Sequence, residues 1–146
     1  MIKDYIKDVD SGSRNAGWRE KLAVQRFKDL RKKYDYDEEE VERILNIVHL
    51  FKYAKGDWRG KPFNLLPHQA FFLSAIFGLK LPNGTRLIRE AMLNMAKKGG
   101  KSEMDGVFAV IFNFFDGEFS AENYIVANKT NKHSTHLSLL KVLLTN

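Results

Sequence analysis

The sequence predicts an α/β fold, in which two amphipathic helices precede the β-α-β-α start of a mainly parallel sheet, and three observations carry that prediction. Residues 86–95 partly alternate between polar and apolar side chains and then turn apolar, as a strand entering a sheet does. A Gly-Gly-Lys-Ser run follows at 99–102. Apolar residues then recur at helical spacing, at Met104, Val107, Phe108, Ile111, Phe112 and Phe115. The order strand, glycine turn, lysine, helix is typical of a phosphate-binding loop.

Composition limits the protein to one modest domain, because the chain has 146 residues of which 44% are hydrophobic. The chain contains no cysteine, which excludes a disulfide framework and a zinc site built on thiolates. No stretch has the length and apolarity of a membrane span, and the N-terminus lacks the apolar core of a signal peptide. We therefore expect a cytoplasmic protein without membrane contact. A net charge of +6 is compatible with a polyanionic partner.

The N-terminal third is predicted to hold a flexible arm and then a basic helix. Residues 1–17 end in a run of small and polar residues, which predicts a flexible arm, and the domain proper is expected to span 18–146. From Trp18 to about Tyr34, an apolar stripe predicts an amphipathic helix. The stripe consists of Trp18, Leu22, Ala23, Phe27, Leu30 and Tyr34, and the basic residues around it are Arg19, Lys21, Arg26, Lys28, Arg31, Lys32 and Lys33. Such a basic face suits a phosphate backbone, although a solvated helix surface has the same composition.

A second helix is predicted from about residue 38 to residue 53. Asp37 and Glu40 have the spacing of an N-terminal capping pair, and apolar residues then repeat at helical steps up to Phe51. The acidic run 37–40 lies in the first turn of this helix, where the helix dipole favours negative charge. We therefore do not interpret this run as a metal site.

A third helix is predicted between Pro67 and Gly78, after a loop at 55–62. It is apolar nearly all round and should be buried. Gln69 in its first turn carries an amide whose donor and acceptor match the N6/N7 edge of adenine. The alternative is that Gln69 is an ordinary polar residue at the start of a helix.

The run 99–102 has the chemistry of a Walker A phosphate loop that binds ATP with Mg²⁺. Gly99 and Gly100 let backbone N–H groups face an anion, while Lys101 can reach the β- and γ-phosphates. The hydroxyl of Ser102 can bind Mg²⁺. The usual pattern G-x-x-x-x-G-K-[ST] lacks its first glycine here, because Met95 occupies that position, so an ordinary solvated turn is the alternative.

The C-terminal part is predicted to contain a turn at 116–118, a second core strand at 121–127 and a last helix that includes Leu137 and Leu144. Two pairs could in principle hold a metal or act as acid and base: Asp116 with Glu118, and His133 with His136. Ordinary turn chemistry explains the first pair, and the second has no third ligand in view.

Taken together, these elements resemble the N-terminal part of the large subunit of tailed-phage terminases, the ATP-driven DNA-packaging motors. The resemblance covers nearly the whole chain, and the order of its motifs is more specific than any one of them. The motifs are Tyr5 with Lys7-Asp8-Val9 and Ser11-Gly12, Lys28-Asp29-Leu30 with Tyr36-Asp37, residues 55–63, Leu66-Pro67-His68-Gln69 with Ile76-Phe77-Gly78, residues 96–102, Asp116-Gly117-Glu118 and Ala127-Asn128-Lys129. Terminase phosphate loops commonly lack the first glycine, which accounts for Met95.

The resemblance implies roles for individual residues. It implies nucleotide binding by Gln69, Lys98, Gly99, Gly100, Lys101 and Ser102, with Ser102 also as the magnesium ligand, and catalytic roles for Lys97 and Lys101. Lys97 stands where terminases usually have an arginine that acts on the γ-phosphate, and a lysine keeps the charge but loses the planar fork. His68 replaces the usual tryptophan before the glutamine. The implied partners are double-stranded DNA, the small terminase subunit and the portal protein.

No apolar strand ending in Asp-Glu and no acidic nuclease segment occurs in the 146 residues. We therefore expect an excised fragment or a truncated gene product that binds nucleotide without turning it over at a useful rate. One alternative is a non-catalytic prophage remnant that binds DNA or packaging proteins. Another is an unrelated P-loop enzyme such as a kinase.

Overall fold

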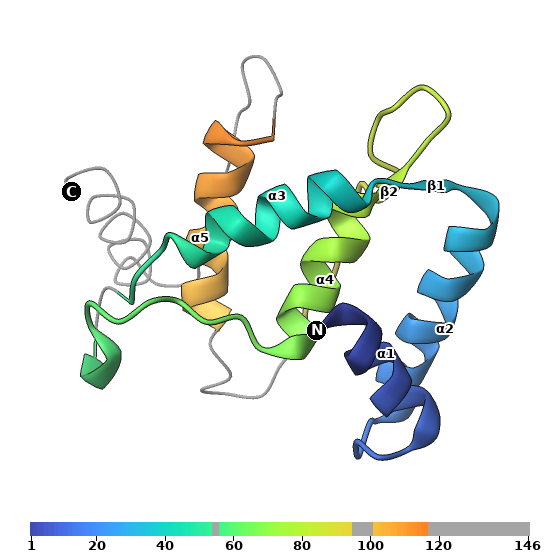
Figure 1. Cartoon of the computed structure of the whole chain (residues 1–146), viewed down its shortest axis with the longest axis horizontal. Coiled ribbons are helices and arrows are strands. Elements are labelled where there is room, and N and C mark those ends of the chain that lie inside the picture. The colour runs from blue at the N-terminus through green and yellow to red at the C-terminus, as the bar shows by residue number, and fades with distance from the viewer. Residues whose placement is uncertain (54–55, 95–100, 117–146) are drawn as a thin grey trace. The chain divides into compact units, whose positions relative to one another are not determined.

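The structure, a computed structural model, describes residues 1–53, 56–94 and 101–116 (Figure 1). Its elements in chain order are α1 (Ile2–Ser11), α2 (Trp18–Lys33), β1 (Asp35–Tyr36), α3 (Glu38–His49), the 3-10 helix η1 (Gly56–Trp58), α4 (Pro67–Gly78), β2 (Leu79–Lys80) and α5 (Lys101–Phe114). They belong to two compact units. The first unit combines Met1–Asn46 with Leu65–Met92, and the second combines Ile47–Asn64 with Leu93–Asn146.

Helix α1 occupies most of the segment 1–17, so the expectation of a flexible arm there is wrong. Apolar residues recur at helical spacing along α1, and Tyr5 and Val9 are buried in the core of the first unit. Gly12 ends the helix in the left-handed conformation with φ of 74°, where a glycine carries no steric penalty. The small polar residues that suggested an arm form the end of α1 and the turn into α2.

Helix α2 begins at Trp18 as predicted, but only the C-terminal half of its predicted apolar stripe faces the core. Val24 and Phe27 are buried, whereas Trp18 and Leu22 are 66% and 58% exposed. The stripe that ran through Trp18 and Leu22 was therefore wrong at its N-terminal end. The physical reason is that α2 contacts the core of the first unit through Val24 and Phe27, which lie beyond its first turn.

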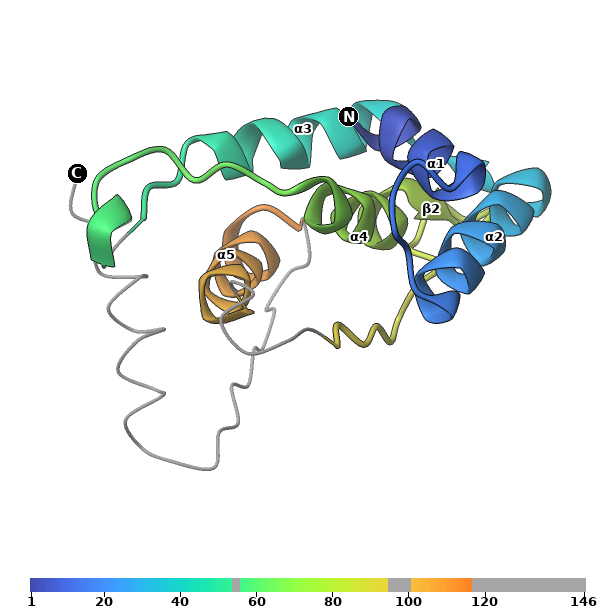
Figure 2. The same ribbon diagram turned by 90° about the horizontal axis from the view of Figure 1, so that it is seen from below.

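Helix α4 is the centre of the first unit, and its bounds match the predicted helix 67–78. Helix α1 lies beside it (Figures 1 and 2), and α2 reaches it through the ring of Phe27. The ring of Phe71 on α4 packs against Tyr5 of α1 and Phe27 of α2, with centroid distances of 5.2 Å in each case. Most of α4 is buried, as its apolar composition predicted. These aromatic contacts hold the N-terminal half of α4 against the first two helices.

The first unit contains a small antiparallel sheet of two strands, which the sequence analysis did not predict. Strands β1 and β2 pair through Tyr36 with Leu79 and Asp35 with Lys80. The expected strand at 86–95 is not formed over its described part, 86–94, which contains only an isolated bridge from Arg86 to Lys80. After a tight turn that follows β2, the Leu87 N–H donates to the Leu79 carbonyl at 2.9 Å, and for the described residues 88–94 no further hydrogen bond to a neighbouring strand follows. The second expected strand, 121–127, and the last expected helix lie outside the described residues.

Helix α3 is capped as predicted, since Asp37 Oδ1 accepts a hydrogen bond from the Glu40 N–H at 2.8 Å. It ends at His49, earlier than the predicted residue 53, and the chain then reverses direction in the second unit. There the Phe63 N–H donates to the Phe51 carbonyl at 2.7 Å. No helix within the described ranges is long and apolar enough to cross a membrane.

Candidate functional site

The predicted phosphate loop leads into helix α5. Lys101 and Ser102 are the first two residues of α5, so the predicted helix after the glycine pair is present. The first N–H groups of a helix have no partner within it, which makes this end of α5 suitable for an anion. Of the predicted apolar stripe, Met104, Val107 and Ile111 are buried, together with Val110, which the stripe did not include. The other members, Phe108, Phe112 and Phe115, are half-buried, so the stripe is confirmed in part. Lys97, Lys98, Gly99 and Gly100 lie outside the described residues.

Gln69 lies in the first turn of α4 and is only 3% exposed. Its Oε1 accepts a hydrogen bond from the Leu66 N–H at 2.9 Å, which fixes the amide and caps the helix start. Within the described part of the chain, no acceptor is recorded for Nε2, and Oε1 keeps a second lone pair. The structure therefore confirms a helix-start role for Gln69 and leaves, among the described residues, two N–H donors and one acceptor lone pair of its amide available, while adenine contact stays a prediction.

A polar cluster of Tyr5, Arg14 and Glu20 supports the first turn of α4, and the sequence analysis missed it. The Tyr5 hydroxyl donates to Glu20 Oε1 at 2.6 Å, and Arg14 Nε donates to the same oxygen at 3.1 Å. The Arg14 guanidinium also lies 5.4 Å from the centre of the Tyr5 ring. Because Tyr5 packs on Phe71, the cluster fixes a ring against which α4 rests. No local pattern signals a contact between residues so far apart in the sequence.

The cluster changes the ionisation of its members. Burial would raise the pKa of Glu20, but the hydrogen bonds from Tyr5 and Arg14 outweigh it, so the net pKa is lowered and the carboxylate is ionised near neutral pH. Burial and the Glu20 carboxylate raise the pKa of Tyr5 far above its usual value, which keeps the hydroxyl protonated as a donor. Burial and the positive charge of Arg14 lower the pKa of His68. The imidazole beside Gln69 is therefore neutral near pH 7.

Comparison with known families identifies the segment that holds these residues. The family model for the ATPase domain of the terminase large subunit matches residues 67–142, slightly more than half of the chain. The chain belongs to this family. The match begins at the first residue of α4 and includes Gln69 and the predicted phosphate loop. Searches among curated proteins and among solved structures gave no match.

Membership in the terminase ATPase family confirms the predicted family and implies nucleotide use and a role related to the packaging motor. The matched segment does not contain the helical front of the protein, α1 to α3, although the structure packs α1 and α2 directly on α4. The family signal and the residues that support α4 therefore lie in different parts of the sequence.

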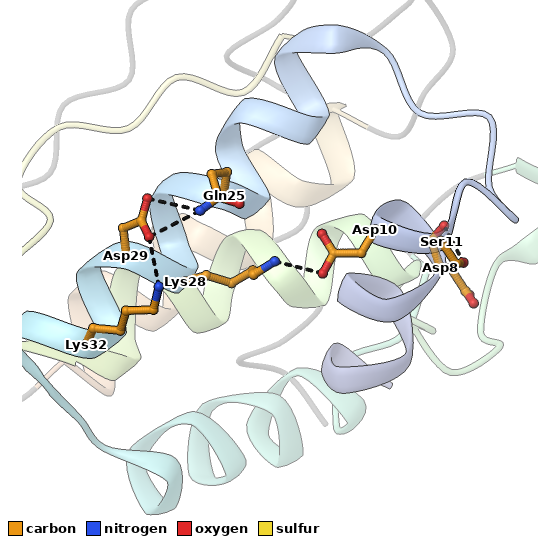
Figure 3. A network of polar contacts seen from close by, with 7 residues as sticks. All are labelled: Asp8, Asp10, Ser11, Gln25, Lys28, Asp29 and Lys32. Atoms are coloured by element: carbon orange, nitrogen blue, oxygen red, sulfur yellow. Dashed lines mark hydrogen bonds and ion pairs between the residues drawn. The ribbon is translucent and has the colours of Figure 1, made fainter.

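The basic face of α2, which was expected to meet DNA phosphates in a terminase, is partly occupied by internal contacts. Lys28 pairs with Asp10 at 2.9 Å, and Arg31 pairs with Glu38 at 3.4 Å. Arg31 also lies 4.1 Å from the centre of the Tyr36 ring. Figure 3 shows that Lys28 reaches from α2 to the end of α1. In the described ranges, no ion pair is recorded for Lys21, Arg26 and Lys33. These three are the cations of α2 most available to an external anion.

The carboxylate and histidine pairs considered for a metal are only partly described. Asp116 follows the end of α5, whereas Glu118, His133 and His136 lie outside the described residues. Among the residues that are described, no group of three or more acidic or histidine side chains could hold a metal ion. The role of Ser102 as magnesium ligand stays a prediction from the sequence.

Proposed function

We propose that this chain is the nucleotide-binding N-terminal segment of a phage terminase large subunit, the ATP-driven motor that packages viral DNA into procapsids. One observation carries the proposal: within the segment that matches the terminase ATPase family, Lys101 and Ser102 open helix α5 directly after a glycine pair. A lysine and a hydroxyl at a helix start, after glycines, are the parts of a phosphate loop. The proposed ligand is Mg-ATP.

In this proposal the loop residues hold the triphosphate. The backbone N–H groups of Gly99 and Gly100 would bind the phosphates together with Lys98, and Lys101 would neutralise the β- and γ-phosphates. Ser102 would hold Mg²⁺, which when bound neutralises charge on the phosphate oxygens. Lys97 is the proposed substitute for the arginine that acts on the γ-phosphate, as a point charge without a bidentate fork.

Gln69 is the proposed adenine-reading residue, and the structure supports it with a specific feature. The amide is buried and held by the Leu66 N–H, with a lone pair and, among the described residues, an unassigned Nε2 donor remaining. Adenine offers the complementary pair, because its N6 group donates and its N7 accepts. Guanine reverses the donor at position 6 to an acceptor, so a fixed amide would discriminate against it.

The partners and location are proposals that follow from the family. Double-stranded DNA, the small terminase subunit and the portal protein are the proposed macromolecular partners, and the host cytoplasm during phage assembly is the proposed location. Arg26 and Lys33 are the residues of α2 that we assign to the DNA phosphates, which predicts weak contact that is indifferent to base sequence.

Titration calorimetry with Mg-ATP and Mg-GTP tests the nucleotide assignment. Lys101→Ala should lower Mg-ATP affinity by at least about tenfold, because a charged hydrogen bond to phosphate is lost. Gln69→Ala should lower the preference for ATP over GTP more than it lowers the total affinity for triphosphate. Lys7→Ala, a surface lysine on α1, is the matched control and should leave both affinities unchanged.

The outcomes separate the parts of the proposal. Equal Mg-ATP affinity in the parent and Lys101→Ala would contradict the phosphate loop. An unchanged ATP preference in Gln69→Ala would leave Gln69 with its capping role alone. Absence of any nucleotide binding by a folded parent would instead favour the non-catalytic module that binds DNA or packaging proteins.

A further inference from the structure

Two large apolar side chains on α2 are exposed at the surface between α1 and α2. Trp18 and Leu22 are one helical turn apart on α2 and are 66% and 58% exposed. They line an open groove of about 620 Å³, whose other wall is the end of α1 at Val9 and Gly12. Trp18 is among the residue types that dominate binding energy at protein interfaces. An exposed apolar pair in a groove marks a surface that a partner covers.

The carboxylate that lines this groove, Asp10, is paired with a lysine. Figure 3 shows Asp10 held by Lys28, at 2.9 Å, and Asp29 held by Gln25 and Lys32, at 3.1 and 3.3 Å. Each carboxylate therefore has a cation of its own.

The cations that have no carboxylate partner determine the sign of the net charge around the groove. Lys21 lines the groove, and in the described part of the chain it has no recorded ion pair. The Arg19 guanidinium lies 5.0 Å from the centre of the Trp18 ring. Helix α2 as a whole has seven lysine and arginine residues against two acidic ones. A partner that complements the groove is therefore acidic.

The apolar content of the groove distinguishes a peptide from nucleic acid. A phosphate backbone is held by cations and hydrogen-bond donors, and it has no apolar side group that would cover Trp18 and Leu22. A peptide can place a bulky apolar side chain between them and its carboxylates on the cations at the rim. We propose that the groove between α1 and α2 binds an acidic peptide segment of another protein, with an apolar anchor on Trp18 and Leu22 and carboxylates on Lys21 and Arg19. This inference is independent of the nucleotide assignment.

A displayed library of random peptides of about 12 residues provides the test, with the whole chain as bait. We expect the selected peptides to be rich in Asp and Glu and to contain Trp, Phe or Leu. Binding of a synthesised winner is then measured through the fluorescence of Trp18 in a Trp58→Phe background, where burial of the indole should shift its emission to shorter wavelength. Trp18→Ala, measured with a labelled peptide, and Leu22→Ser should each lower affinity by at least about tenfold.

Charge and location are tested by two more variants. Lys21→Glu should lower the affinity for the acidic peptide by about tenfold, and this effect should be smaller at high salt. Leu50→Ser removes an exposed leucine elsewhere, 76% exposed, and should leave the affinity unchanged. The proposal would be overturned if the selected peptides were not enriched in Asp and Glu. It would also be overturned if Trp18→Ala and Leu22→Ser bound the peptide as tightly as the parent does. It would also be overturned if a short DNA duplex shifted the Trp18 emission and displaced the peptide.

Discussion

Gly78, the last residue of α4, allows a close packing that a single methyl group should disrupt. A Cβ built at Gly78 would lie 2.7 Å from Val41 Cγ2 and 2.9 Å from the Cζ atom of Tyr36, and closer still to Tyr36 Cε2. The Gly78 carbonyl also accepts a hydrogen bond from the Asp37 N–H at 2.8 Å, so the backbone cannot retreat freely. We therefore predict that Gly78→Ala destabilises the first unit.

The magnitude follows from two opposing effects. Replacing glycine by alanine in a helix stabilises it by at most about 1 kcal/mol. Overpacking costs about 1–3 kcal/mol, and the upper end applies here because the Tyr36 ring is already held by Phe27, at 5.6 Å, and by Arg31, at 4.1 Å. The net loss should be about 2 kcal/mol, equivalent to roughly 5 °C in Tm for a chain of this size.

Thermal and urea unfolding followed by circular dichroism measure this loss. Gly17→Ala is the matched control, because a Cβ there meets no atom within 4 Å and φ is −66°, which alanine adopts readily. The control should change the free energy of unfolding by about 0.5 kcal/mol or less. A Tm for Gly78→Ala at or above that of the parent would refute the reasoning, since it would mean that Tyr36 and Val41 make room without cost.

Two further predictions concern the helical front of the protein. Tyr5→Phe keeps the ring on Phe71 but removes the hydrogen bond to Glu20, and should cost about 1 kcal/mol in urea unfolding near pH 7. The pKa of Glu20 is lowered in the folded state from its ordinary 4.5, so the stability that Glu20 contributes is present above that value and is lost as the pH falls through the folded pKa. The free energies of unfolding of the parent and Tyr5→Phe should therefore converge in acid. A difference between them that does not change with pH would contradict this. The second prediction concerns DNA. In gel shifts across a salt series, Arg26→Gln should lower the affinity for DNA and its salt dependence more than Lys28→Gln does, because Lys28 is paired with Asp10. Equal effects of the two substitutions would mean that the ion pair of Lys28 with Asp10 opens when DNA binds.

The sequence alone determined those features that depend on neighbours along the chain. The bounds of α4 were predictable because Pro67 suits a helix start and Gly78 a helix end, with an unbroken apolar run between them. The Asp37 cap and the helix that begins at Lys101 were predictable for the same reason, since caps and periodicity act over a few residues. The family was predictable because the order of many short motifs is itself a property of the sequence.

Only the tertiary structure decided which surfaces those elements bury and which polar groups meet. The helix α1 was missed because its short apolar face becomes stable only against Phe71, far away in the chain. The expected strand at 86–94 is absent from the described residues, where pairing with Leu79 and Lys80 stops at Leu87, because a strand needs a partner along its whole length. The contact of Tyr5 with Glu20 and the pairing of Lys28 with Asp10 join residues on different helices. Propensity and spacing carry no information about such contacts, since they depend on how helices pack in space.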